Sequence, residues 1–124
     1  MSRTILVIDD EQGIRVILKA TLEFMAGWQV LLASSGAEGI ATAQAAQPEA
    51  ILLDVMMLGV DGISLFHQLQ AQPETREIPV IFLTAQARDV ERQELEALGA
   101  GVILKPFEPA AIASQISKLL SWSD

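Results

Sequence analysis

The chain has 124 residues, of which 51% are hydrophobic and 19% charged, and its formal net charge is -8. The length suits one domain with a sizeable core, and the composition argues against disorder. The acidic balance argues against direct binding to nucleic acid or to an anionic membrane surface, since both favour a basic patch. The lack of cysteine excludes disulfides and thiolate chemistry. No apolar stretch approaches the roughly 20 residues of a membrane helix, so we expect a soluble, cytoplasmic protein.

Short apolar runs alternate with segments of helical period along the whole chain. These runs are rich in Val, Ile and Leu and are mostly continuous, which is typical of strands buried on both faces of a parallel sheet. The predicted strands are 5–8, 30–33, 50–53, 80–83 and 102–104.

A helix is predicted after each strand. The first has an apolar face that comprises Ile14, Ile17, Leu18, Leu22 and Met25. The second opens on a capping box, Ser35 with Glu38, and runs to about Ala46. The third covers Asp61 to Ala71.

The last two predicted helices differ in their apolar faces. The fourth, over 89–99, ends on Gly99 as a C-terminal glycine and has a thin apolar face of Val90, Leu95 and Leu98. The fifth begins near Glu108 and Pro109. Its predicted buried face comprises Ile112, Ile116, Leu119 and Leu120.

Five strand–helix units in succession predict an α/β fold with right-handed crossovers. In such open sheets, ligands bind beyond the C-terminal ends of the strands, where the strand order reverses. Polar side chains follow four of the predicted strands at this end: Asp9 and Asp10, Asp54, Thr84, and Lys105. We expect them to share one crevice at the rim of the sheet without deep burial.

Each of these residues also has a purely structural interpretation. Asp10 alone could cap the first helix, Asp54 could cap a loop, and Thr84 could serve the backbone. Lys105 could balance the acids in an ion pair. None of these interpretations explains why five polar groups converge on one edge from four strands.

Together, the residues suit phosphoryl chemistry. Three carboxylates held close together repel one another, and a hard divalent cation such as Mg²⁺ relieves this repulsion through oxygen ligands. With the charge neutralised by the metal and by Lys105, a carboxylate such as Asp54 can attack phosphorus as a nucleophile. The metal, Lys105 and Thr84 could supply the positioning and charge stabilisation that phosphoryl transfer requires.

The sequence resembles the receiver domain of two-component response regulators over essentially its whole length. The motifs that carry the resemblance are "VIDDE" (7–11), "ILLDVMM" (51–57), "DG" (61–62), "FLTA" (82–85) and "LKPF" (104–107). No single motif is specific, but their order and spacing together are. The resemblance implies a flavodoxin-like, doubly wound sheet of five parallel strands in the order 2-1-3-4-5, with helices on both faces.

The resemblance also implies residue roles. Asp54 would accept a phosphoryl group from a histidine kinase or a phosphotransfer protein. Mg²⁺ would be held by Asp9, Asp10, Asp54 and the backbone carbonyl of Met56. Lys105, whose peptide bond to Pro106 is commonly cis in the family, would bind a phosphoryl oxygen, and Thr84 would hydrogen-bond the phosphoryl group.

Two positions depart from the family pattern. Leu58 replaces a loop proline after the phosphoacceptor, which should loosen that loop modestly. Val102 stands where the family often has a Tyr or Phe that turns inward as the threonine moves. Coupling between an aromatic ring and Thr84 is therefore not expected in this chain.

We predict that residues 1–124 form a single, stand-alone receiver domain with no output domain and that it is a switch rather than an enzyme. Its output would be a changed protein-binding surface on the 84–122 face, with homodimerisation left open. Alternatives are a receiver-like interaction module that is not phosphorylated and an aspartate-nucleophile phosphatase. A phosphatase of that kind usually has a second acid two residues after the nucleophile, and here that position is Met56. A flavin-binding module of similar topology is disfavoured because "DDEQG" would repel a phosphate.

Overall fold

The computed structural model describes residues 3–57, 60–85 and 89–122. In this part of the chain, five strands form one parallel sheet: β1 (Thr4–Ile8), β2 (Gln29–Ala33), β3 (Ala50–Asp54), β6 (Val80–Thr84) and β7 (Gly101–Leu104). Their order in space is β2-β1-β3-β6-β7, which confirms the predicted order of first to fifth sheet strands. An additional antiparallel pair, β4 (Met56–Met57) and β5 (Val60–Asp61), follows β3 and was not predicted, because two-residue strands leave no periodic pattern.

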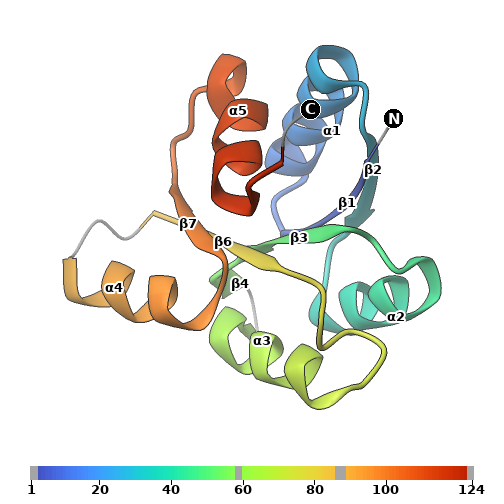
Figure 1. Cartoon of the computed structure of the whole chain (residues 1–124), viewed down its shortest axis with the longest axis vertical. Helices are drawn as coiled ribbons and strands as arrows, with labels where there is room; N and C mark the ends of the chain where they lie inside the picture. The colour runs from blue at the N-terminus through green and yellow to red at the C-terminus, as the bar shows by residue number, and fades with distance from the viewer. Residues whose placement is uncertain (1–2, 58–59, 86–88, 123–124) are drawn as a thin grey trace.

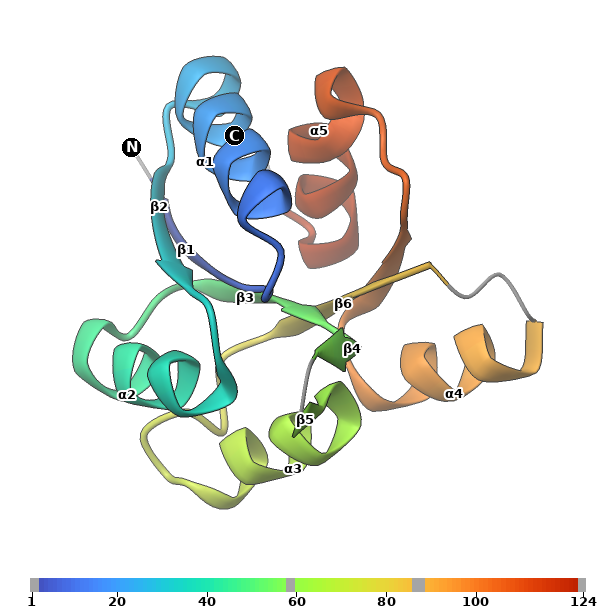
Figure 2. The ribbon, with the colours of Figure 1, turned by 180° about the vertical axis from the view of Figure 1, so that it is seen from behind.

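Helices cover both faces of the sheet. α1 (Gln12–Ala26) and α5 (Pro109–Leu120) lie on one face, and α2 (Gly36–Ala46), α3 (Gly62–Ala71) and α4 (Asp89–Leu98) lie on the other (Figures 1 and 2). This is the predicted doubly wound α/β architecture. No helix in the described residues is long and apolar enough to cross a membrane.

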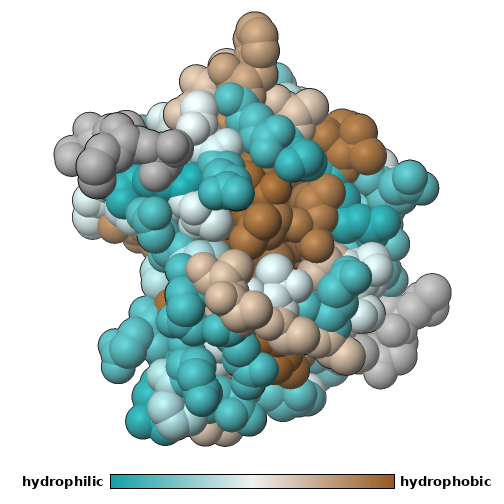
Figure 3. All heavy atoms as spheres, turned by 90° about the vertical axis from the view of Figure 1, so that its right-hand side faces the viewer, coloured by the Kyte–Doolittle hydropathy of each residue, from teal (hydrophilic) through white to brown (hydrophobic). Residues whose placement is uncertain are grey.

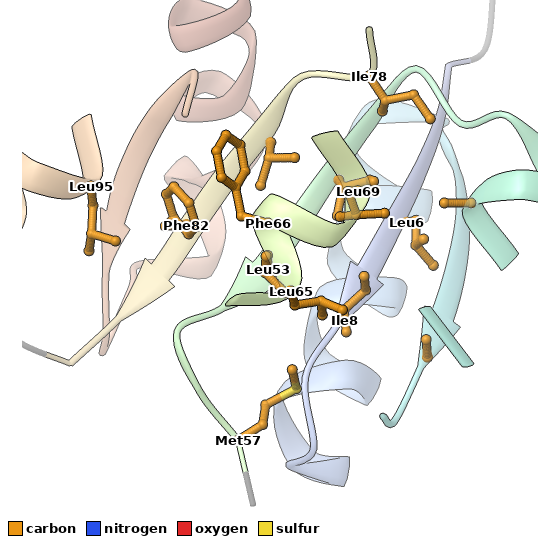
Figure 4. Close-up of a cluster of buried hydrophobic side chains, with 14 residues drawn as sticks. Leu6, Ile8, Leu53, Met57, Leu65, Phe66, Leu69, Ile78, Phe82 and Leu95 are labelled. Atoms are coloured by element: carbon orange, nitrogen blue, oxygen red, sulfur yellow. The ribbon is translucent and has the colours of Figure 1, made fainter. Parts of the chain in front are cut away.

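The continuous apolar strands supply two cores, one on each face of the sheet. In β1, Leu6 and Ile8 join the core under α2, α3 and α4, whereas Ile5 and Val7 join the core under α1 and α5. Figure 4 shows the first of these cores, with Phe66 of α3 beside Phe82 of β6. Successive residues of a strand point to opposite faces, so a strand that is buried on both sides must be apolar throughout.

Two helix starts have side-chain caps, of which the sequence predicted the first. The Ser35 hydroxyl accepts a hydrogen bond from the backbone N–H of Glu38 at 3.2 Å, while the Glu38 carboxylate reaches back to Ser34 rather than to Ser35. Asp61 caps α3 by accepting a hydrogen bond from the Ile63 N–H at 3.0 Å. α3 therefore begins at Gly62, one residue later than predicted.

Some residues predicted on buried helix faces are exposed. α1 packs through Leu18 and Leu22, so Ile17, roughly 100° around the helix from Leu18, stays 45% exposed. Met25 is 55% exposed because it lines a groove between α1 and the start of α5. The other two corrected residues are Leu98, in the last position of α4, and Leu119, whose side chain lies beside Gly101 of the edge strand β7.

Gly99 follows α4 as predicted but for a different reason. Gly27, with φ +70°, is the described glycine in the left-handed region, and Gly99 is not. A Cβ atom on Gly99 would instead lie 2.7 Å from the carbonyl oxygen of Val80 and 2.8 Å from the ring of Phe82. Glycine therefore lets the end of α4 approach the backbone of β6 closely.

This contact predicts that Gly99→Ala lowers the free energy of unfolding by about 1–3 kcal/mol, because backbone must move to accept the methyl group. Gly13→Ala is the matched control: a Cβ there meets nothing within 4 Å, and α1 should gain up to about 1 kcal/mol. Urea unfolding of the three proteins measures both changes. Equal stability of the two variants would contradict the close approach at Gly99.

Candidate functional site

The predicted site residues lie at the C-terminal edge of the central strands. Ile8 of β1 pairs with Leu53 of β3, which places Asp9 beside Asp54. The next strand over, β6, ends at Thr84, and Lys105 follows β7 directly. Parallel strands that share one register therefore bring residues far apart in sequence to the same crevice.

The acids are more deeply buried than the sequence predicted. Asp54 is the last residue of β3 rather than the first beyond it, and it is 3% exposed, while Asp9 is fully buried. Such burial needs a compensating charge. Lys105 provides it, with its Nζ at 3.0 Å from Asp9 Oδ2 and 3.3 Å from Asp54 Oδ1, and 3.7 Å from an oxygen of Glu11.

Hydrogen bonds fix the loop that carries Asp9 and Asp10. The Asp9 N–H donates to the carbonyl of Ala33 at 3.1 Å, and Asp9 Oδ1 accepts from the Glu11 N–H at 2.9 Å. The guanidinium of Arg15 donates to the Asp9 carbonyl at 2.7 Å. Asp10 does not cap α1, because Glu11 occupies the cap position and makes no side-chain cap bond. This disfavours the structural interpretation of Asp10.

The two oxygens of Asp54 have different surroundings. Oδ1 lies near Lys105 and accepts a hydrogen bond from the Met56 N–H at 3.3 Å. Oδ2 is buried and has no hydrogen-bond partner among the described residues. A buried oxygen of this kind is costly unless another group satisfies it, so it is the natural contact for an incoming ion or phosphoryl group.

The electrostatics of the crevice shift two pKa values. Burial, together with the negative charge of Asp9, raises the pKa of Asp54 from 3.8 to about 6, and Lys105 only partly opposes this. Burial works to lower the pKa of Lys105, but its hydrogen bond to Asp9 and the charges of both acids raise it overall. The crevice therefore holds a firmly protonated lysine beside a carboxylate whose ionisation is disfavoured.

The residues present fit a magnesium ion. One carboxylate oxygen from each of Asp9, Asp10 and Asp54 can be chosen so that all three lie within 4.8 Å of one another. Hard oxygen donors of this kind are the ligands that Mg²⁺ prefers, and one oxygen of Asp54 has no hydrogen-bond partner among the described residues. Met56, the fourth predicted contributor, lies in β4 two residues after Asp54, and its carbonyl as a ligand stays a prediction.

Sequence reasoning missed the packing requirement at Gly62. A Cβ atom there would lie 2.6 Å from the backbone oxygen of Asp54 and 2.6 Å from the Cα of Val55. The Gly62 N–H also donates to the Val55 carbonyl at 2.8 Å. Glycine therefore brings the start of α3 against the chain that carries Asp54. The "DG" motif was noted only as part of the resemblance, and its physical reason needs the three-dimensional contact.

The other predicted features of the site are present in part. The Lys105–Pro106 peptide bond is cis, as the resemblance implied, and the Lys105 N–H donates to the Thr84 carbonyl at 2.8 Å. Thr84 is 2% exposed and is the last residue of β6. Its neighbour in the chain, Leu83, pairs with Asp54 of β3. Val102 packs half-buried against the core under α3 and α4. Leu58 lies outside the described residues.

Known proteins share both the sequence and the fold. Residues 5–117 match the family of the response regulator receiver domain. The alkaline phosphatase synthesis transcriptional regulatory protein PhoP of Bacillus subtilis is 34% identical over 125 aligned positions, which cover 100% of this chain and 51% of the relative. The phosphate regulon transcriptional regulatory protein PhoB of Pseudomonas aeruginosa is 36% identical, with 97% of this chain and 52% of the relative covered.

Solved structures agree. The chemotaxis protein CheY4 of Vibrio cholerae superposes with a TM-score of 0.87 at 30% identity, covering 96% of this chain and 99% of the other. The receiver domain of the sensor histidine kinase PA1611 of Pseudomonas aeruginosa, which has a magnesium ion coordinated in its active-site cleft, superposes with a TM-score of 0.84 at 26% identity, covering 98% of this chain and 99% of that one.

The chain belongs to the response regulator receiver domain family of two-component systems. Domains of this family are signalling modules rather than enzymes. The chain spans about half the length of the curated relatives it matches. The expectation that residues 1–124 make up a stand-alone domain without an output domain stays a prediction.

The raised pKa of Asp54 predicts a specific pH dependence of stability. Because its folded-state pKa of about 6 lies above the ordinary 3.8, ionising Asp54 opposes folding, and this cost grows as pH rises from about 4 to 6 and is complete above about 7. Asp54→Asn removes the cost and leaves Lys105 paired with Asp9. Without Mg²⁺, we expect the variant to be the more stable protein by on the order of 1–2 kcal/mol at pH 7, allowing for solvent screening at the mouth of the crevice.

Urea unfolding in a chelator at pH 5, 6, 7 and 8 measures this difference. The advantage of Asp54→Asn should grow between pH 5 and pH 7 and then level off. A difference that stays constant across the whole range would mean that Asp54 titrates normally.

Proposed function

We propose that this chain is a cytoplasmic phosphorylation switch in which Asp54 accepts a phosphoryl group from a histidine kinase or a phosphotransfer protein, with Mg²⁺ required. The observation that carries the proposal is the arrangement around Asp54. Its Oδ2 is buried without a hydrogen-bond partner in the described residues, and its Oδ1 lies 3.3 Å from the amine of Lys105. Asp9, Asp10 and Asp54 can each offer one carboxylate oxygen such that all three lie within 4.8 Å of one another.

The proposed reaction is a single displacement at phosphorus. A carboxylate oxygen of Asp54 forms the new P–O bond as the P–N bond of the donor phosphohistidine breaks, and the departing imidazole takes up a proton. The carboxylate must be ionised to attack, and the pKa of about 6 allows this at neutral pH. Mg²⁺, held by Asp9, Asp10 and Asp54, would supply positive charge next to the phosphoryl oxygens.

Lys105 has a place in both states of this switch. Before transfer, its Nζ lies between Asp9 and Asp54. Once Asp54 is phosphorylated, a phosphoryl oxygen carries the negative charge beside the amine of Lys105. The lysine side chain is flexible and needs only a short movement to meet it. Thr84, at the end of the neighbouring strand, would hydrogen-bond another phosphoryl oxygen and transmit the change to the start of the segment before α4.

The alternatives account for fewer of these observations. An aspartate-nucleophile phosphatase needs a second acid to protonate the leaving group, and Met56, 66% exposed, occupies the expected position. A module that is never phosphorylated would have no use for a buried group of like charges, which destabilises the unmodified fold.

The direct test is intact mass after incubation with Mg²⁺ and acetyl phosphate. We expect the wild-type protein to gain one phosphoryl group, because acetate can leave in place of imidazole, and Asp54→Asn to gain none. Removal of Mg²⁺ with a chelator should abolish the gain. Asp61→Asn is the matched control, since Asp61 is an exposed acid whose capping role asparagine can fill, and it should react as the wild type does.

A folded wild-type protein that binds Mg²⁺ but gains no mass would refute phosphoryl transfer from small donors. Mass gain in Asp54→Asn would move the acceptor to another residue.

The exposed face of α1 suits the protein donor. Val16, Ile17, Phe24 and Met25 are 55%, 45%, 91% and 55% exposed, and α1 starts directly after the loop of Asp9 and Asp10. Hydrophobic side chains gather on the side of the molecule formed by α1 and the edge strand β2 (Figure 3). A donor that brings its phosphohistidine to the crevice would first meet the initial turns of α1, with Val16 and Ile17, and could extend along the helix towards Phe24 and Met25. Exposed apolar patches of this kind mark protein contacts.

We expect Ile17→Ser to lower the rate of transfer by about tenfold from any histidine kinase that phosphorylates the wild-type chain in phosphotransfer profiling. The rate with acetyl phosphate should not change, because the crevice is intact. Leu119→Ser, at a similarly exposed position on α5, is the control and should leave both rates unchanged. If Ile17→Ser and Leu119→Ser lowered the rate of phosphotransfer equally, the proposal that the donor binds α1 would be wrong.

The output surface is proposed on the 84–122 face. This face includes α4, with Glu91, Glu94 and Glu96, and the exposed side chains of Leu104 and Leu119. A protein partner that binds there would detect changes that begin at Thr84. Homodimerisation through this face remains an alternative to a different partner.

A further inference from the structure

A pocket of about 260 Å³ lies beside the phosphoacceptor, between the β4–β5 pair, the start of α3 and α4. Its floor is apolar and comprises Val55, Ile63 and Leu95, together with Thr84. Small-molecule sites are usually larger, about 300–1,000 Å³. The pocket therefore suits one side chain of a protein better than a free metabolite.

The rim of this pocket is acidic. Asp61, Glu91 and Glu94 line it from two different elements, the N-cap of α3 and the first turns of α4. A lysine or arginine side chain matches both features, since its methylene stem packs on apolar surface while its charged end meets carboxylates. An acidic or neutral partner side chain would lack this complementarity.

The pocket is joined directly to Asp54. Val55 follows it in the chain, and the Met56 N–H donates to Asp54 Oδ1. Thr84, at the pocket floor, ends the strand that pairs with β3. Three residues of the pocket wall, Val55, Met56 and Thr84, are therefore close to Asp54 in the chain or in the sheet. If binding in the pocket prefers one state of Asp54, it must in turn favour that state.

We propose that this pocket binds a basic side chain of a protein partner and that its affinity depends on the state of Asp54. Only the dependence on the state of Asp54 rests on the proposed function. Affinity for the basic side chain can be measured on the unmodified protein.

The probe is Nα-acetyl-lysine amide, followed by backbone amide NMR of the 15N-labelled protein in 0.15 M salt, with Nα-acetyl-norleucine amide as the uncharged control. We expect saturable shifts at Val55, Met56, Ile63 and Leu95 with a Kd on the order of 1–10 mM, as for one charged contact with an apolar stem. The norleucine probe should cause no saturable shift there.

Matched variants test the rim. Glu94→Gln should weaken lysine-probe binding at least threefold, and the double variant Glu91→Gln with Glu94→Gln should abolish it. Glu96→Gln, on the same helix but not lining the pocket, should bind as the wild type does. The amide spectrum itself reports whether each variant is folded.

Coupling is tested by repeating the titration with Mg²⁺ and beryllium fluoride, a phosphoryl mimic. We expect the Kd to change at least threefold in the wild type and to stay constant in Asp54→Asn. Three outcomes would overturn the proposal that the pocket binds a basic side chain: equal binding of both probes, shifts that persist in the double variant, or no saturable shift. Specific binding of the lysine probe with the same Kd in both states would overturn the proposal that its affinity depends on Asp54.

These outcomes separate the inference from the proposed function. If acetyl phosphate adds no mass to the protein but the lysine probe binds selectively, the proposed function fails and the pocket stands. If mass is gained at Asp54 and the probe does not bind, only the inference fails.

Discussion

The structure depends on the attraction between one buried amine and two buried carboxylates. Lys105 follows the end of another strand and forms ion pairs with both Asp9 and Asp54. Without Lys105, both acids would be buried charges with no positive partner among the described residues, in a region of low dielectric constant. The compensation is incomplete, because burial and the negative charge of Asp9 outweigh Lys105, and the pKa of Asp54 remains raised to about 6. The resting fold therefore keeps an unfavourable charge arrangement that added positive charge relieves.

This charge imbalance lies at the end of the most tightly packed part of the fold. The strands that carry the acids are the rigid centre of the fold, apolar on both faces and packed into two cores. Three described segments are attached to the ends of these strands: the β4–β5 pair after β3, Ala85 after Thr84, and Lys105 with the cis peptide bond to Pro106. Under the proposed function, these segments would take up a change of charge at Asp54, because the strands themselves are packed on both faces.

The fold and the membership of the site were predictable for identifiable reasons. Strands buried on both faces must be continuous apolar runs, and parallel strands must end at one edge, so Asp9, Asp54, Thr84 and Lys105 could be placed together before any coordinates. Burial depth was not predictable. The predicted strand ended at residue 53, whereas β3 ends at Asp54. This shift of one residue buries the Asp54 side chain and so raises its pKa.

Features that depend on contacts between distant segments could not be predicted from the sequence either. The need for glycine at positions 62 and 99 arises where a helix end meets another strand's backbone, and nothing in the local pattern distinguishes these from ordinary turn glycines. The bond from Arg15 to the Asp9 carbonyl is another example: an arginine on an amphipathic helix reads as a solvated charge until the loop it faces is placed. The predicted buried faces of the helices were wrong for a related reason. Ile17 fits the helical period but stays 45% exposed, and Leu119, whose side chain lies beside Gly101 of the edge strand β7, stays 38% exposed.

The exposed apolar side of α1 and the proposed output face around α4 and β7 lie on opposite sides of the same crevice. α1 presents its uncovered side chains next to the loop of Asp9 and Asp10, while α4 and β7 lie beyond Thr84 on the other side. A donor on α1 and a partner near α4 would therefore not compete for space, although both would depend on Asp54. Under the proposed function, this separation would let the domain receive a phosphoryl group at one face and present the result at another, with Lys105 and the ends of the sheet strands lying between the two faces.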